Sequence, residues 1–354
     1  MSSIYNNQKF LQFPGRIQAL REGRVLAPVH IRIKPVNKCN HDCWYCAYRV
    51  SNLQLGEDMD HDDVIPADKM AQIVDDVIDM GVKAVTFSGG GEPLLYKQLP
   101  ETIKNLAAGG IRIGALSNGS NLKGRVADAF AEYATWIRIS LDGWDDESYA
   151  KARDIKEGAF SQLIENLRSF SARSSKCTLG TSFIIDNKNY THIYDICAQL
   201  KDAGVQHVKL YGVIINNDGR KNNAYHQDIA EETMALIEKA KALEGDGFSI
   251  VNHYHLLEDR FEKTYTSCPF LTYLTIIGAD SNVYTCQDKA YNKDGLLGSI
   301  KDRSFKDFWF SEENKQRMDA VNPSKMCKHH CVSNEKNLTL IEHLSLDEDH
   351  ACFV

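Results

Sequence analysis

Three cysteines stand close together near the start of the chain, where Cys39, Cys43 and Cys46 fall within the segment CNHDCWYC. Thiolates are good ligands for zinc and for iron–sulfur clusters, so this spacing indicates a metal site. Structural zinc takes four ligands, and His41 offers a fourth, so a zinc site is one interpretation. An iron–sulfur cubane, which usually takes four thiolates, is the other. Three thiolates would leave one iron open to a small-molecule ligand.

A second group of cysteines occupies the last quarter of the chain: Cys268, Cys286, Cys327 and Cys331. Three others, Cys177, Cys197 and Cys352, stand apart, and the periodicity around Cys197 predicts a core position. The 354-residue chain has no run of eighteen apolar residues and no apolar segment of the secretory type at its start. We therefore expect a cytoplasmic protein without a membrane span. In a reducing cytoplasm, two separate cysteine groups indicate metal rather than disulfides.

The charge of the chain argues against one class of partner. The formal net charge is −7, and no cluster of Lys and Arg with interleaved aromatic residues is present. This composition gives no general attraction to nucleic acid, so we expect no nucleic-acid partner.

Strand-like and helix-like segments alternate through most of the chain. Strands are expected over 29–37, 83–89, 111–117, 136–142, 177–185 and 205–214. Helices are expected over 67–81, 97–110, 122–134, 159–173, 190–204 and 228–243. Six strands that alternate with six helices predict an α/β fold with a parallel sheet, which right-handed crossovers would wind into an open or closed barrel.

Unusual segments follow the first four expected strands. The first cysteine group follows strand one, SGGGEPL (88–94) follows strand two, SNGS (117–120) follows strand three and SLDG (140–143) ends strand four. Because α/β barrels hold their active sites at the carboxyl ends of the strands, we expect these segments to line one rim. The acidic segment GEDMDHDD (56–63) lacks the ligand spacing of an EF-hand and is interpreted as a solvated loop.

Two of these segments carry a family resemblance. The CxxxCxxC spacing with Tyr45 before the last cysteine, and the sequence Gly90-Gly91-Glu92-Pro93 after the second strand, resemble the signature of the radical S-adenosylmethionine (radical SAM) superfamily over about residues 28–245. The resemblance implies a partial (β/α)6 TIM-like barrel and a [4Fe–4S] cluster on the first three cysteines. Its fourth iron would bind SAM. An electron from a flavodoxin- or ferredoxin-type reductant would then give a 5′-deoxyadenosyl radical that abstracts hydrogen from a substrate.

The resemblance also implies which residues would meet SAM. Gly90, Gly91 and Glu92 would lie at its amino group. The remaining candidates are Tyr45, Ser117 and Asn118 near SAM, Ser140 and Asp142 at the ribose hydroxyls, and Arg153 at the carboxylate. The SNG segment equally fits an Asn-Gly turn, and Arg153 a solvated helix charge.

The C-terminal part resembles an extension that binds an auxiliary cluster. Two apolar runs around GADSN predict a hairpin between Cys268 and Cys286, and a helix and CKHHC follow. This order is similar to the SPASM and Twitch extensions, and four cysteines imply one fully ligated second [4Fe–4S] cluster in a small α+β domain. A four-cysteine zinc knuckle, or His329 or His330 in place of a cysteine, are alternatives. The predicted division is 1–27 (N-terminal extension), 28–245 (radical SAM core) and 246–354 (auxiliary domain and tail).

These features predict an enzyme in which the second cluster accepts or relays an electron. The resemblance implies a sugar-like or other small polar substrate that undergoes dehydrogenation or epimerisation. Cys352 is a candidate hydrogen donor if the tail folds over the barrel mouth, and residues 48–63 and 211–227 are expected at that mouth, the latter as a polar surface loop. A peptide-modifying enzyme is a second hypothesis, although we expect too few residues before the first strand for a leader-binding module. A non-catalytic iron–sulfur electron carrier is a third.

Overall fold

A single sheet organises the protein. The computed structural model describes residues 4–49, 53, 55–173, 175–255, 261–347 and 349–353. Its ten strands are ordered β10-β9-β8-β1-β2-β3-β4-β5-β6-β7. They are β1 (His30–Ile33), β2 (Ala84–Phe87), β3 (Arg112–Ser117), β4 (Trp136–Leu141), β5 (Thr178–Ile185), β6 (His207–Gly212), β7 (Ser249–Asn252), β8 (Leu274–Ile277), β9 (Asn282–Tyr284) and β10 (Leu296–Ser299). Neighbours from β8 through β7 are parallel, which confirms the predicted α/β class.

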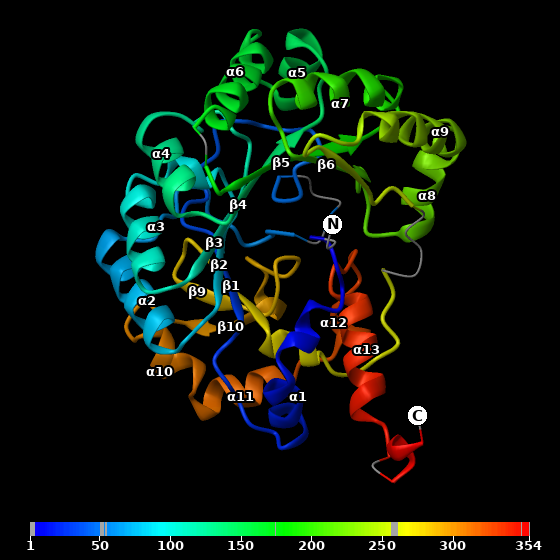
Figure 1. The fold of residues 1–354 in the computed structure, drawn as a ribbon. Helices are drawn as coiled ribbons and strands as arrows, with labels where there is room; N and C mark the ends of the chain where they lie inside the picture. Colours follow the sequence, from blue (N-terminus) through cyan, green and yellow to red (C-terminus); the bar gives the residue numbers. More distant parts are fainter. Residues whose placement is uncertain are drawn as a thin grey trace.

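Helices cover the outer face of the curved sheet. The α-helices among the described residues are α1 (Pro14–Arg21), α2 (Ala67–Asp79), α3 (Leu99–Ala108), α4 (Gly124–Tyr133), α5 (Asp146–Arg153), α6 (Ala159–Ser171), α7 (Ile193–Asp202), α8 (Gly219–Gln227), α9 (Ala230–Ala240), α10 (Phe305–Trp309), α11 (Glu312–Asp319), α12 (Pro323–Met326) and α13 (Asn334–Leu344). Figure 1 shows α2 to α9 in an arc outside β1 to β6. None of the described helices is long and apolar enough to cross a membrane.

The core lies between these helices and the outer face of the sheet. Helix α2 buries Met70, Ile73, Val74 and Val77, which recur at helical spacing and form one apolar stripe. Strand β1 buries Ile31 and Ile33 in the same core, whereas His30 and Arg32 are only half-buried. Because side chains alternate along a strand, these two polar residues face the inside of the curved sheet. The fold thus keeps its apolar packing outside the strands and its polar groups inside.

The C-terminal hairpin forms as predicted, but it joins the main sheet. Strands β8 and β9 pair antiparallel around the GADSN turn, and β8 pairs parallel with β1, from His30↔Leu274 to Ile33↔Ile277. The first strand therefore lies between β2 and β8. The division of the chain at residues 27/28 and 245/246 stays a prediction.

Two expectations for individual segments need correction. The expected polar loop within 211–227 contains helix α8, whose first amides are capped by the Asp218 side chain, which accepts from Arg220 N and Lys221 N. Strand β7, which follows the expected last helix, had no place in the predicted six-strand pattern. Both segments are short, and neither shows strong periodicity of apolar residues, so the sequence pattern did not reveal them.

Candidate functional site

The segments after β1 and β2 are joined through their backbones. The Glu92 amide donates to the Lys38 carbonyl at 3.0 Å. A Cβ atom at Gly91 would lie 2.2 Å from the Lys38 oxygen, and one at Gly90 would lie 2.4 Å from Oδ1 of Asn37. Only glycine permits such close approach. The glycine loop is therefore pressed against the chain that enters the first cysteine group.

Glu92 links the glycine loop to the segment after β3. Its side chain is 2% exposed. Oε1 accepts from the Leu94 amide at 2.9 Å and from Ser117 Oγ at 2.7 Å, and Oε2 accepts from the Asn118 amide at 2.7 Å. Burial raises the pKa of this carboxyl group, and the three hydrogen bonds oppose the rise. Glu92 therefore links the glycine loop to the SNG segment, and its contact with an amino group stays a prediction.

Asparagines complete the connection among the three loops. Asn118 Nδ2 donates to Asn40 Oδ1 at 2.9 Å, and Asn40 Nδ2 donates to Ser120 Oγ at 2.9 Å. The SNG segment is thus bonded directly to the residue that follows Cys39. The loops after β1, β2 and β3 form one hydrogen-bonded rim, as the sequence predicts for the carboxyl edge of the sheet.

The three N-terminal cysteines lie in a tight, half-buried turn. The Cys46 amide donates to the Cys43 carbonyl at 2.9 Å. Burial, opposed by the charge of Arg153, raises the pKa of Cys43 to about 12, and the neighbouring thiols Cys46 and Cys39 contribute to that rise. The three sulfurs are therefore close enough to affect one another, and bound metal would favour their thiolate form. The His41 ring places Nδ1 3.4 Å from Nη1 of Arg153, an arrangement that favours three thiolates over a zinc site completed by His41.

Arg153 braces this turn from the end of α5. It is 1% exposed, and its Nε donates to Asp142 Oδ1 at 2.7 Å. Its Nη2 donates to the Ser140 carbonyl at 2.9 Å and to Tyr45 OH at 3.2 Å. The Asp42 amide in turn donates to the Arg153 carbonyl at 2.9 Å. Because its donors are directed at protein acceptors, the geometry favours a positioning role for Arg153 over direct contact with a SAM carboxylate.

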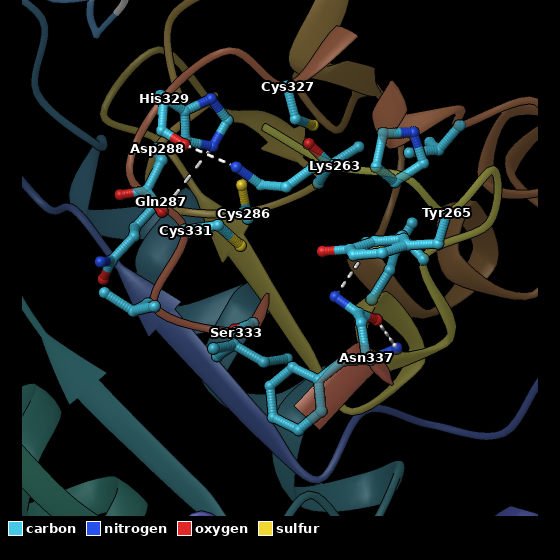
Figure 2. Close-up of a pocket in the computed structure, with 18 residues that line it drawn as sticks. Lys263, Tyr265, Cys286, Gln287, Asp288, Cys327, His329, Cys331, Ser333 and Asn337 are labelled. Atoms are coloured by element: carbon cyan, nitrogen blue, oxygen red, sulfur yellow. Dashed lines mark hydrogen bonds and ion pairs between the residues drawn. The ribbon is translucent and has the colours of Figure 1, made fainter. Parts of the chain in front are cut away.

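The four C-terminal cysteines line one cavity. Cys268, Cys286, Cys327 and Cys331 surround it together with Lys263, Tyr265 and Asn337. Figure 2 shows Cys286, Cys327 and Cys331 around the same space. Asn337 Nδ2 lies 3.4 Å from Cys268 Sγ. Four thiols around a shared, largely apolar space match the ligand number of a cubane cluster, so the residues fit the group that the sequence predicts.

His329 adds another donor at the same cavity. The residue is 2% exposed, and neither ring nitrogen has a hydrogen-bond partner among the described residues. Nε2 lies 4.0 Å from Asp288 Oδ2. Ligand atoms of Cys286, Asp288 and His329 all lie within 4.8 Å of one another. Replacement of a cysteine ligand by His329 is therefore a geometric alternative.

A buried lysine connects the two cysteine regions, and sequence reasoning missed it. Lys34 is 1% exposed, and its Nζ donates to Tyr48 OH at 2.5 Å and to the Gly89 carbonyl at 2.8 Å. Tyr48 OH donates to the Gln287 carbonyl at 3.1 Å, beside Cys286. Burial lowers the pKa of Lys34 to about 7. The available signal was a charged residue at an inward position of the pattern HIRIK.

The remaining predicted residues lie elsewhere. Cys352 is exposed on the short 3₁₀ helix His350–Cys352, and Figure 1 shows the chain ending beyond α13, far from β5 and β6. The structure does not bring this thiol to the barrel mouth. Cys177 and Cys197 are buried in the core. Within the expected mouth segment 48–63, residues 50–52 and 54 lie outside the described residues. Glu57 and Asp58 donate their amides to the 291–292 turn.

Comparison with known proteins gives these sites a family. Residues 33–197 match the family model of the radical SAM superfamily, and residues 268–332 match the SPASM model, described as an iron–sulfur cluster-binding domain. The two matches contain all seven cysteines of the sites described above.

Individual relatives agree with this assignment. Fe-coproporphyrin III synthase from Methanosarcina barkeri is 22% identical over 318 residues, which cover 83% of this chain and 76% of that protein. A probable GTP 3′,8-cyclase from Methanococcus maripaludis is 32% identical over 130 residues, which cover 36% of this chain and only 41% of the relative.

Solved structures show the same fold. SuiB from Streptococcus suis, solved with its precursor peptide SuiA, has a TM-score of 0.62 at 16% identity and covers 94% of this chain and 78% of SuiB. SuiB has also been solved with S-adenosylmethionine. The cofactors of the two matched domains are a SAM-binding [4Fe–4S] cluster and an auxiliary iron–sulfur cluster. The chain therefore carries an N-terminal radical SAM domain over residues 33–197 and a C-terminal SPASM domain over residues 268–332.

Proposed function

We propose that this enzyme uses the 5′-deoxyadenosyl radical to abstract a hydrogen atom from a small polar substrate, most simply a sugar-like one, bound inside the curved sheet. When bound, the reduced N-terminal cluster supplies the electron that cleaves SAM and releases this radical. The observation that supports the proposal is the hydrogen-bonded rim. Glu92 accepts a hydrogen bond from Asn118 and so links the glycine loop to the SNG segment. Asn40 accepts from Asn118 and links both to the cysteine turn. These contacts hold the loops that the resemblance assigns to SAM.

The chain's own residues provide a polar chamber below this rim. Ser140 and Tyr211 are half-buried on the inner faces of β4 and β6, and Ser182 is buried on β5 between them. Such groups suit a hydroxylated ligand, because buried polar groups fix the orientation of a substrate through hydrogen bonds. Lys34 donates to Tyr48, and Tyr48 donates to the Gln287 carbonyl beside Cys286 in the second cysteine region.

Two outcomes are compatible with this arrangement. In a dehydrogenation, the substrate radical gives one electron to the auxiliary cluster and one proton to a base, so that the substrate loses two hydrogens in all. In an epimerisation, the substrate radical receives a hydrogen atom from a donor and keeps its mass. We favour dehydrogenation, because the candidate hydrogen donor Cys352 is exposed on a segment beyond α13, away from the barrel mouth.

A peptide substrate is the second candidate. The observation that favours it is the likeness of the fold to SuiB, which was solved with its precursor peptide. Mass spectrometry separates the two candidates by showing which molecule changes. A small-molecule dehydrogenase lowers the mass of a metabolite by two hydrogens, whereas a peptide-modifying enzyme changes the mass of a peptide chain.

The test is cleavage of SAM by the anaerobically reconstituted, full-length protein after reduction with dithionite. We expect 5′-deoxyadenosine and methionine from the wild type, and none from Cys46→Ala. The matched control is Cys177→Ala, which removes a buried core thiol and should retain cleavage. A wild-type protein with both clusters that forms no 5′-deoxyadenosine would be an electron carrier. Flavodoxin and ferredoxin, tested in place of dithionite, would identify the physiological type of reductant.

A further inference from the structure

Cations occupy the inner face of the sheet. Arg32 on β1, Arg138 on β4 and Lys209 on β6 are half-buried, and each is flanked in its strand by fully buried apolar residues of the outer face. The alternation of side chains therefore directs all three toward the interior. Barrels of this class usually fill that interior with branched apolar side chains. A set of cations in this place needs an explanation.

The cations share one space around Tyr5. Tyr5 OH accepts from Arg138 Nη1 at 3.0 Å and lies 2.9 Å from His207 Nε2. The ammonium group of Lys209 lies 5.2 Å from the centre of the Tyr5 ring. In Figure 1 the N-terminal end of the chain lies within the arc of strands. Burial lowers the pKa of Arg32, and the nearby positive charge of Arg138 contributes to the lowering.

The two arginines keep donor atoms without acceptors among the described residues. Arg32 donates to Gln287 Oε1 and Arg138 donates to Tyr5 OH, and both acceptors are neutral. In the part of the chain that the structure describes, the Nε atom of each arginine is buried without a hydrogen-bond partner. The negative charge of Asp288, after β9, opposes this lowering of the Arg32 pKa. Burying guanidinium donors without acceptors is costly, so Arg32 and Arg138 favour an additional acceptor in this space.

A hydroxyl lies beside the cations. Ser182 is 2% exposed, its Oγ has no hydrogen-bond partner among the described residues, and it pairs in register with Lys209. Arg138 lies two residues before Ser140 on β4, which places it about 7 Å deeper in the chamber than the rim. A ligand held at this depth would still reach the rim with the rest of its structure.

We propose that Arg32, Arg138 and Lys209, with Ser182, bind an anionic group of the substrate, a phosphate or a carboxylate, deep inside the barrel. This inference rests on the proposed function, which places the substrate in the same chamber. Arginine suits the role because its fork of donors matches the oxygens of both groups. Binding of this anionic group would orient the substrate and so fix which of its carbons faces the rim.

The test is calorimetric titration of the full-length, anaerobically reconstituted protein with inorganic pyrophosphate and, separately, with citrate. SAM is kept saturating, so that its own carboxylate site is filled. We expect saturable binding of one equivalent, and the tighter of the two probes identifies phosphate or carboxylate as the group. Arg138→Gln should weaken binding about tenfold or more, because it removes a charge-assisted hydrogen bond. Arg138→Lys should weaken binding of the probe less than Arg138→Gln does.

The matched control is Arg112→Gln, which changes an exposed arginine at the start of β3 and should leave binding unchanged. Iron content and SAM cleavage are measured on the same samples. If the wild type cleaves SAM but binds neither probe, or if Arg138→Gln with normal iron binds as tightly as the wild type, the anion site is wrong and the proposed function stands. If the probes bind as expected but SAM is not cleaved, the proposed function fails and the anion site stands.

Discussion

Glu92 is the side chain on which the contacts between three loops converge. One carboxylate accepts from a backbone amide of its own loop and from a hydroxyl and an amide of the SNG segment. The sequence predicts Glu92 as a contact of an amino group, and the structure shows that it is also a connector. Residue type could not reveal this, because the Ser117 and Asn118 partners are brought to it by the pairing of β2 with β3.

The first prediction concerns this connector. Glu92→Gln replaces an acceptor oxygen by a donor, so one of the buried donors loses its partner. We expect the free energy of unfolding to fall by about 1–3 kcal/mol and SAM binding to weaken. Urea titration and equilibrium dialysis with SAM measure the two effects. Glu101→Gln, an exposed residue of α3, is the control. If Glu92→Gln leaves the free energy of unfolding and the affinity for SAM unchanged, Glu92 does not act as a connector between the loops.

The second prediction separates the two ligand sets of the auxiliary site. If the four cysteines are the ligands, His329→Gln should keep the full iron content, whereas Cys331→Ala should lower it. If His329 is a ligand, the histidine variant should lose iron as the cysteine variant does. Iron and acid-labile sulfide analysis of both reconstituted variants decides between them. We expect the four-cysteine result, because all four thiols line the same cavity.

At the scale of elements, α5 is the support of the first cysteine turn. The amides of Asp42 and Trp44 donate to the carbonyls of Arg153 and Ala152, at its last turn. The helix begins with a capping box, in which the Asp145 side chain accepts from the Ser148 amide and Ser148 Oγ accepts from the Asp145 amide. The position of the cysteine turn thus depends on a helix that contributes none of the cysteines.

The third prediction follows from this support. Asp145→Ala removes the cap and should lower the free energy of unfolding by about 1 kcal/mol. The amides of Asp42 and Trp44 should also exchange with deuterium faster, because their acceptors lie at the other end of the same helix. Lys156→Ala, an exposed position beyond the helix, is the control. Faster exchange elsewhere but not in this turn would show that α5 does not hold it.

The sequence predicts the strongly periodic elements well and the short ones poorly. All six strands of the expected barrel and the late hairpin are present. Helices α5 and α8 were missed, because polar residues fill most of their positions and the caps that start them are local signals. The inward cations Arg32, Lys34, Arg138 and Lys209 were missed as a group, because local patterns do not show which side chains of separate strands meet inside a curved sheet.

At the scale of the whole molecule, the two matched domains share one sheet. Strand β8 continues the main sheet beyond β1, and Trp309 of α10 packs in the main core and donates Nε1 to the Leu26 carbonyl at 2.9 Å. Such pairing between residues far apart in the chain cannot be deduced from local patterns. The two cysteine regions are therefore held at a fixed separation, with Lys34 and Tyr48 between them.

The fourth prediction concerns the pH dependence of global stability. His207 is 5% exposed, and burial lowers its pKa to about 4, from about 6.5 in an unfolded chain. As the pH falls from about 7.5 to about 5.5, the unfolded state takes up a proton that the folded state excludes. The free energy of unfolding should fall by about 1 kcal/mol from this group alone. His207→Gln should reduce that loss in anaerobic urea titrations, and His61→Gln should not. An equal pH dependence in the wild type and both variants would contradict this.

The most direct test of the whole account is the iron and sulfide content of three anaerobically reconstituted proteins. They are the wild type, the Cys39/Cys43/Cys46→Ala triple variant and the Cys268/Cys286/Cys327/Cys331→Ala quadruple variant. Two cubane clusters predict about eight irons in the wild type and about four in each variant. About four irons in the wild type and none in the triple variant would contradict the account. The C-terminal cysteines would then hold no iron cluster, and substrate oxidation would lose its electron acceptor.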